Sequence, residues 1–88
     1  MIVKFSKTAE TEYNQFKSYG DQNCVDKIVA LLKSILSEGV DEGLGKPERL
    51  KYFKHATYSR RINREHRLVY QEREGVIYVL SCMGHYKK

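Results

Sequence analysis

Hydrophobic positions in the first half of the chain recur with the period of an α-helix. In one stretch they fall at i, i+4 and i+7, at Ala9, Tyr13 and Phe16. In the next they form a broader face, made by Val25, Ile28, Val29, Leu32, Ile35 and Leu36. Ser6 or Thr8 can cap the first helix, and Asp21 can cap the second, which ends at Gly39. The pattern predicts two consecutive amphipathic helices, joined at residues 19–20 into a helical hairpin.

The period changes from helical to extended after residues 39–47, a loop that holds the only proline. Four stretches beyond it read as strands, at residues 50–54, 57–63, 66–72 and 76–83. Tight turns at residues 64–65 and 74–75 connect them, and residues 1–5 form a further strand. We expect an α+β fold in which the helical hairpin packs on one face of a twisted antiparallel sheet. The length predicts a single domain spanning residues 1–88.

Charge is distributed unevenly along the chain. Residues 1–45 carry five lysines and seven acidic residues, a net charge of −2. Residues 46–88 carry eleven lysines and arginines against four glutamates, a net charge of +7. Basic surfaces are common in proteins and aid solubility, but an excess confined to one half of a chain is typical of a face that binds a polyanion.

The remaining composition excludes several classes of protein. No apolar run approaches the roughly 18 residues of a membrane span, and residues 1–7 are too short an apolar start for a signal peptide. We therefore expect a cytoplasmic protein with no membrane contact. Cys24 and Cys82 have no spacing typical of a zinc site or a disulfide scaffold, so we expect two reduced, packed thiols and no metal or cofactor.

The second half also contains the side chains needed to cleave RNA without a metal. Glu48 follows a proline at the start of a strand, Arg67 lies within an apolar strand, and His85 and Tyr86 lie near the end of the chain. Such cleavage needs one group to take the proton of the 2′-hydroxyl, one to neutralise charge on phosphorus and one to protonate the leaving oxygen. The 2′-hydroxyl occurs only in RNA, so this chemistry would also select its substrate.

Taken singly, each of these residues has an ordinary structural explanation. Most surface glutamates are merely solvated, and a terminal histidine or tyrosine often has no role. An arginine within an apolar strand needs a partner, an edge position or a ligand, because burying its charge unpaired is unfavourable. Arg60 and Arg61 alternate across the sheet, so they cannot face the same ligand. The argument for a site therefore depends on the co-occurrence of all four groups.

Three segments carry a resemblance to a known family: residues 45–51 (GKPERLK), residues 58–70 (YSRRINREHRLVY) and the pair His85-Tyr86. They strongly resemble the YoeB/Txe toxins, which belong to the RelE-like superfamily of bacterial toxin–antitoxin modules. The resemblance implies a ribosome-dependent endoribonuclease that cuts messenger RNA in the decoding site. It also implies an acidic antitoxin of the YefM/Axe type as a partner and allows a homodimer.

Roles for individual residues follow from the same resemblance. Glu48 would be the general base, Arg67 the stabiliser of the phosphorane, His85 the general acid and Tyr86 the group that positions the nucleotide. Basic residues expected to contact RNA are Lys46, Lys51, Arg61 and Arg64.

Two alternatives stay open at this point. A toxin of the same fold could act on a target other than RNA, such as gyrase, although Glu48, Arg67 and His85 together argue against it. A non-catalytic nucleic-acid-binding module would need the basic half of the chain but would have no use for the Glu48 and His85 pair.

The expected strand register sets a geometric condition on the site. If Arg73 pairs with Val76, regular pairing places Arg67 opposite Cys82, and His85 then points to the other face of the sheet. The catalytic side chains can meet only if the chain departs from strand geometry near Gly84, through a bulge or a turned-out terminus.

Overall fold

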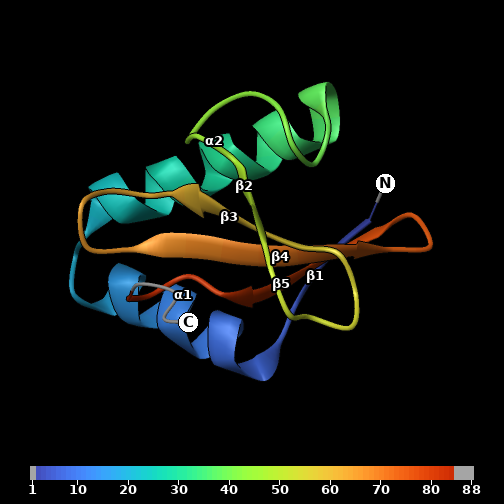
Figure 1. Cartoon of the computed structure of the whole chain (residues 1–88). Coiled ribbons are helices and arrows are strands. Elements are labelled where there is room, and N and C mark those ends of the chain that lie inside the picture. The colour runs from blue at the N-terminus through green and yellow to red at the C-terminus, as the bar shows by residue number, and fades with distance from the viewer. Residues whose placement is uncertain (1, 85–88) are drawn as a thin grey trace.

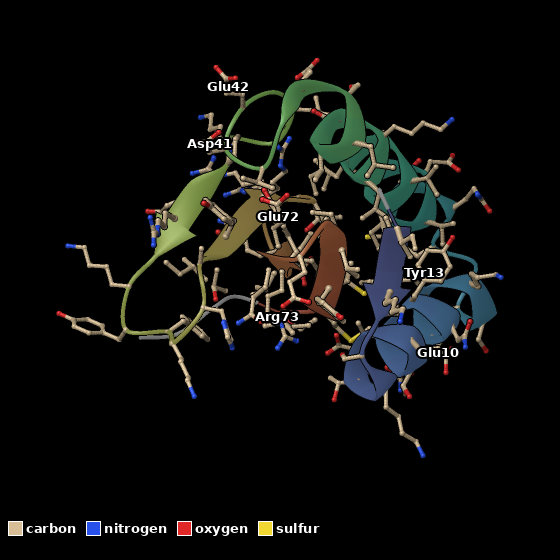
Figure 2. All side chains as sticks on the ribbon, turned by 90° about the vertical axis from the view of Figure 1, so that its right-hand side faces the viewer. Glu10, Tyr13, Asp41, Glu42, Glu72 and Arg73 are labelled. Carbon is tan, nitrogen blue, oxygen red and sulfur yellow. The ribbon has the colours of Figure 1, made fainter. Side chains whose placement is uncertain are left out.

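The computed structural model describes residues 2–84 and contains two helices on one face of a five-stranded sheet (Figure 1). The elements along the chain are β1 (Ile2–Phe5), α1 (Lys7–Ser18), α2 (Gln22–Glu38), β2 (Glu48–Leu50), β3 (Thr57–Arg61), β4 (Arg67–Arg73) and β5 (Val76–Ser81). Figure 2 shows both helices on one side of the sheet, and β2, which is an edge strand of the sheet, at the opposite side of the view. The expected α+β fold with a helical hairpin is confirmed.

The strands are ordered β1-β5-β4-β3-β2. The succession from β2 to β5 is antiparallel, as the sequence predicts. β1 instead pairs in parallel with β5, which makes the sheet mixed. Parallel pairing needs a long connection between the two strands, and here the helical hairpin and the other three strands lie between them in the chain.

Both helices begin at capping residues that the sequence indicates. The Ser6 hydroxyl accepts a hydrogen bond from the Ala9 amide at 3.0 Å, so Ser6 rather than Thr8 caps α1. The Asp21 carboxylate accepts from the Cys24 amide at 3.1 Å and caps α2. Each cap satisfies one of the free N–H groups at a helix start. α2 ends at Gly39, whose φ of 113° is a conformation that favours glycine.

β2 departs most from its predicted bounds. A strand at residues 50–54 was expected, but pairing begins at Glu48 and ends at Leu50, opposite Thr57. β3 starts at that same Thr57, so residues 51–56 must form the connection and cannot continue the strand. The sequence of residues 51–56 contains none of the residue types that mark a turn, so the end of the strand could not be predicted from it. Tyr52 within it has a φ of 70°, which is incompatible with a strand.

The hydrophobic core lies between the helices and the adjacent face of the sheet. Its fully buried members, with no exposed surface, are Ala9, Ile28, Leu31, Leu68, Tyr70, Ile77, Val79 and Cys82. The apolar face of α2 is narrower than the sequence indicates, because Val29 and Leu36 are 38% and 45% exposed. Only one side of α2 meets the sheet. In the described part of the chain, no helix is long and apolar enough to cross a membrane.

Both cysteines are free and buried, which confirms the expected packed thiols. Burial is the main cause that raises the pKa of Cys24 to about 11 and that of Cys82 to about 12. The reactive form of cysteine is the thiolate, so these pKa values make both side chains poor nucleophiles at neutral pH.

Among residues 2–84, one charged side chain is fully buried. Arg60, on β3, is 0% exposed and directs its guanidinium toward the loop that follows α2. Its hydrogen-bond acceptors are the Tyr70 hydroxyl at 2.8 Å, the Ser34 hydroxyl at 3.0 Å and the carbonyls of Gly39, Glu42 and Leu44 at 2.7, 2.6 and 2.8 Å. A guanidinium has five N–H donors, and five acceptors match them. The loop, which carries Asp41 and Glu42 in Figure 2, is therefore wrapped around a buried cation.

We predict that Arg60→Met destabilises the fold by about 3 kcal/mol or more, since three loop carbonyls lose their donor at ~1–3 kcal/mol each. Arg60→Lys should lose less, because an ammonium can still donate to some of these acceptors. Urea unfolding of both variants measures the difference. The neighbouring Arg61 is exposed, so Arg61→Met should stay within about 0.5 kcal/mol of the parent protein. Equal losses for Arg60→Met and Arg61→Met would contradict the structural role of Arg60.

Candidate active site on the open face of the sheet

Alternation along the strands directs a second set of side chains away from the helices. Arg61 lies opposite Arg67 in the β3–β4 pairing, and Glu48 lies opposite Ser59 in the β2–β3 pairing. Side chains at directly opposed positions share a face of the sheet. Arg60, the residue before Arg61, faces the helices instead, which confirms that the two arginines cannot serve one ligand. We call the side away from the helices the open face.

A hollow of about 300 Å³ on the open face brings together four of the eight predicted site residues. Its lining residues are Lys46, Glu48, Ser59, Arg61 and Arg67, and we call it the first hollow. Four of these five residues were expected from the sequence. Ser59 was not, and the only available signal was its position two residues before Arg61 on the same strand, which places both on one face.

The loop that supplies Lys46 is held tightly against β3. The Arg61 amide donates to the Gly45 carbonyl at 2.7 Å. A β-carbon on Gly45 would lie 2.6 Å from the Leu31 side chain and 3.2 Å from that of Arg60, so a larger residue would force its neighbours to shift. Together with the bonds from Arg60, these contacts fix the path of the chain into β2 and hence the position of Glu48.

Arg67 is anchored through one end of its guanidinium. Nη1 donates to the carbonyls of Asn63 at 2.9 Å and His66 at 3.2 Å. Nε and Nη2 have no hydrogen-bond partner within residues 2–84. Two planar N–H donors with a fixed direction suit the oxygens of a phosphate. The anchored half of the side chain therefore positions the half that is available to a ligand.

His66 has a role that the sequence did not indicate. Its Nδ1 accepts a hydrogen bond from the Gly84 amide at 2.9 Å, and its ring packs edge-on against Phe16 with the ring centres 5.0 Å apart. The Arg67 amide also donates to the Gly84 carbonyl, at 3.0 Å. Both polar groups of Gly84 are thus bound to the start of β4. The chain is held there immediately before His85 and Tyr86, the two predicted site residues that lie outside the described residues.

A bulge in β5 interrupts its regular pairing with β4. Arg73 pairs with Val76 as expected, but Val69 lies opposite Ser81 while Tyr70 lies opposite Val79, so Leu80 is an extra residue in β5. The departure comes earlier than the predicted position near Gly84. Pairing shifts by one residue beyond it, and a one-residue shift reverses which side chains share a face. Regular pairing of Arg67 with Cys82 does not occur.

The other predicted basic residues lie at different distances from the first hollow. Arg64 lines an adjoining hollow together with Lys46, Arg61 and Arg67. Lys51 belongs to neither hollow and lies in the loop after β2, where it borders a separate depression with Tyr52. The structure thus groups Arg64 with the site and separates Lys51 from it. No cluster of three or more metal-binding side chains occurs among residues 2–84.

A family model described as the YoeB-like toxin of bacterial type II toxin–antitoxin systems matches residues 5–86. The chain belongs to this family. The match extends well beyond the motifs at residues 45–51 and 58–70, and it confirms the resemblance found in the sequence.

Individual relatives agree with this assignment to the YoeB-like toxins. The toxin YoeB of Synechocystis sp. is 36% identical over 88 residues, which cover the whole of both chains. The solved structure of the YoeB dimer from Staphylococcus aureus is 46% identical, covers 98% of each chain and superposes with a TM-score of 0.90. A YoeB–YefM complex from the same organism is 45% identical, covers 98% of each chain and gives a TM-score of 0.87.

We predict that His66→Phe releases the Gly84 amide while it preserves the packing of an aromatic ring on Phe16. The substitution removes only the acceptor nitrogen, so stability should fall by about 1 kcal/mol, the typical net value of one hydrogen bond. Amide hydrogen exchange measured by NMR should show faster exchange at Gly84, with unchanged protection at Tyr70 in the centre of the same strand pair. Unchanged exchange at Gly84 would mean that this hydrogen bond does not hold the chain.

Proposed function

We propose that this YoeB-like toxin is an endoribonuclease that cleaves messenger RNA on the ribosome. The observation that carries the proposal is the presence of Glu48 in a hollow whose other charged residues are the cations Lys46, Arg61 and Arg67. The cations suit a phosphodiester. A carboxylate in the same place repels one, which weakens simple binding but supplies a base beside the scissile phosphate. This combination favours catalysis over a non-catalytic nucleic-acid-binding module.

The proposed reaction is an internal transfer at phosphorus. Glu48 takes the proton of the 2′-hydroxyl, the 2′-oxygen attacks phosphorus, and the bond from phosphorus to the 5′-oxygen breaks. Arg67 donates through Nε and Nη2 to the phosphate oxygens as negative charge accumulates on them. His85 protonates the departing 5′-oxygen and Tyr86 positions the nucleotide, roles that rest on the sequence motif alone. Lys46 and Arg61 hold the substrate, and Arg64 and Lys51 bind RNA outside the first hollow.

Two partners are proposed from the relatives. The Staphylococcus aureus YoeB–YefM complex supports an antitoxin of the YefM type for this chain. An acidic, partly disordered antitoxin would be attracted to the basic half of the toxin and would order as it binds. The YoeB dimer from the same organism supports a homodimer. We infer that the toxin acts in the cytoplasm, where its proposed ribosomal target resides.

We expect Arg67→Ala to reduce the rate of cleavage by about 10²–10³, the usual scale for one electrostatic stabiliser of a transition state. Arg67→Lys should recover little of this loss, because a point charge does not replace two planar donors. The matched control is Arg73→Ala, at the other end of β4, where the guanidinium stacks 4.3 Å from the centre of the Tyr78 ring. Single-turnover cleavage on ribosomes with bound messenger RNA provides the rates. A rate near that of the parent protein for Arg67→Ala would remove Arg67 from the site.

The products report directly on the nucleophile. Attack by the 2′-hydroxyl should leave a 2′,3′-cyclic phosphate on one fragment and a 5′-hydroxyl on the other. A substrate with a single 2′-deoxy nucleotide at the scissile position should not be cut, and Glu48→Gln should slow the reaction of the all-ribose substrate. Mass spectrometry of the fragments identifies the end groups. A 5′-phosphate end would show that water is the nucleophile, and the proposed mechanism would then be wrong.

A further inference from the structure

A second hollow of about 360 Å³ adjoins the first, and three positively charged side chains line both. The shared side chains are Lys46, Arg61 and Arg67. Lys27 and Arg64 add two more cations, and the remaining lining residues are neutral. The first hollow contains the carboxylate of Glu48, whereas no carboxylate of residues 2–84 lines the second. Five positively charged side chains therefore line the second hollow, and no negatively charged side chain of residues 2–84 lies among them.

Lys27 comes from α2, far in the sequence from the other four cations. It lies one helical turn after Cys24, so the two side chains share a side of the helix. Cys24 is buried, and its sulfur accepts a hydrogen bond from the side-chain Nδ2 of Asn63 at 3.4 Å. This contact fixes the β3–β4 turn against the start of α2. Lys27, which is half-buried, is thereby held beside the turn that carries Arg64.

The turn itself is rigidly built. The Asn63 side-chain oxygen accepts hydrogen bonds from the amides of Glu65 and His66, both at 2.8 Å. The Ile62 amide donates to the His66 carbonyl at 3.0 Å. Asn63 therefore joins the turn to α2 through one end of its amide and closes the turn with the other. The second hollow is consequently a feature of packed elements and not of a free loop.

We propose that the second hollow binds the phosphate of the nucleotide next to the scissile one, with Lys27 as a dedicated contact. The proposal rests on the proposed function, because the adjoining first hollow is where the scissile phosphate would lie. A phosphodiester carries one full negative charge at each nucleotide, so a chain seated in the first hollow must place another charge close by. The contact would be to the backbone and independent of base identity.

The decisive experiment combines a protein variant with a modified RNA. The RNA carries a 2′-deoxy nucleotide at the scissile position, so that it binds without being cut. A neutral methylphosphonate replaces the phosphodiester immediately 5′ or immediately 3′ of the scissile phosphate. Binding of the toxin to ribosomes programmed with each RNA is measured at several salt concentrations. Lys27→Met removes the charge, and Lys33→Met is the matched control on an exposed position of the same helix outside the hollow.

With unmodified phosphates, Lys27→Met should weaken binding by about fivefold, the scale of one charge pair near water. It should also lower the slope of log Kd against log salt by about 0.7, as expected for one contact to a single strand. One of the two methylphosphonate RNAs should weaken binding of the parent protein to a similar extent. Lys27→Met should then show no further loss on that RNA, because the group that Lys27 contacts is already absent.

The opposite results are equally clear. Equal effects of Lys27→Met and Lys33→Met, losses that add on both modified RNAs, or no binding by the parent protein would overturn the phosphate site. Failure of the proposed function would look different, because the parent protein would then bind the programmed ribosome but leave an all-ribose messenger RNA intact. Cleavage by the parent protein with no effect of Lys27→Met on binding would overturn the phosphate site and leave the proposed function intact.

Discussion

The guanidinium of Arg60 lies out of contact with solvent, and the carbonyls of the loop after α2 supply most of the acceptors that its charge requires. A buried cation is tolerated only when its donors are all paired. Here the requirement dictates the shape of the loop, since Gly39, Glu42 and Leu44 must all turn their carbonyls toward one point. That loop then delivers Lys46 and Glu48 to the open face. A charge with no proposed contact with RNA thus determines where the proposed base lies.

Burial of Arg60 also changes how the net positive charge of residues 46–88 should be interpreted. Arg60 and Arg61 are adjacent, yet one is fully buried and the other lines the first hollow. The net charge of residues 46–88 therefore overstates the charge that the surface presents. The surface cations matter by their grouping, because three of them border both hollows. Local concentration of charge on a few fixed elements attracts a phosphate more effectively than the same charge spread over a globule.

Much of this organisation could be predicted from the sequence, where the information is local. Helix caps, apolar stripes and the alternation of Arg60 with Arg61 depend on neighbours a few residues apart. The sequence did not reveal the parallel pairing of β1, the extra residue at Leu80 or the role of His66 in holding Gly84. Each of these depends on a contact between distant segments. Lys27 was missed for the same reason, since only the packing of the β3–β4 turn on α2 brings it to the other cations.

The two hollows resolve a conflict within the proposed chemistry. The proposed base, the carboxylate of Glu48, must lie close to the scissile phosphate. Its negative charge then weakens the binding of that phosphate. Binding energy gained at a neighbouring phosphate can offset this loss without altering the reacting centre. Removal of Lys27 should accordingly weaken the complex and leave the chemical step of bound RNA unchanged, whereas removal of Arg67, which borders both hollows, should impair both. Separation of the two effects depends on the turn at Asn63, which keeps the second hollow in place while the proposed reaction takes place in the first.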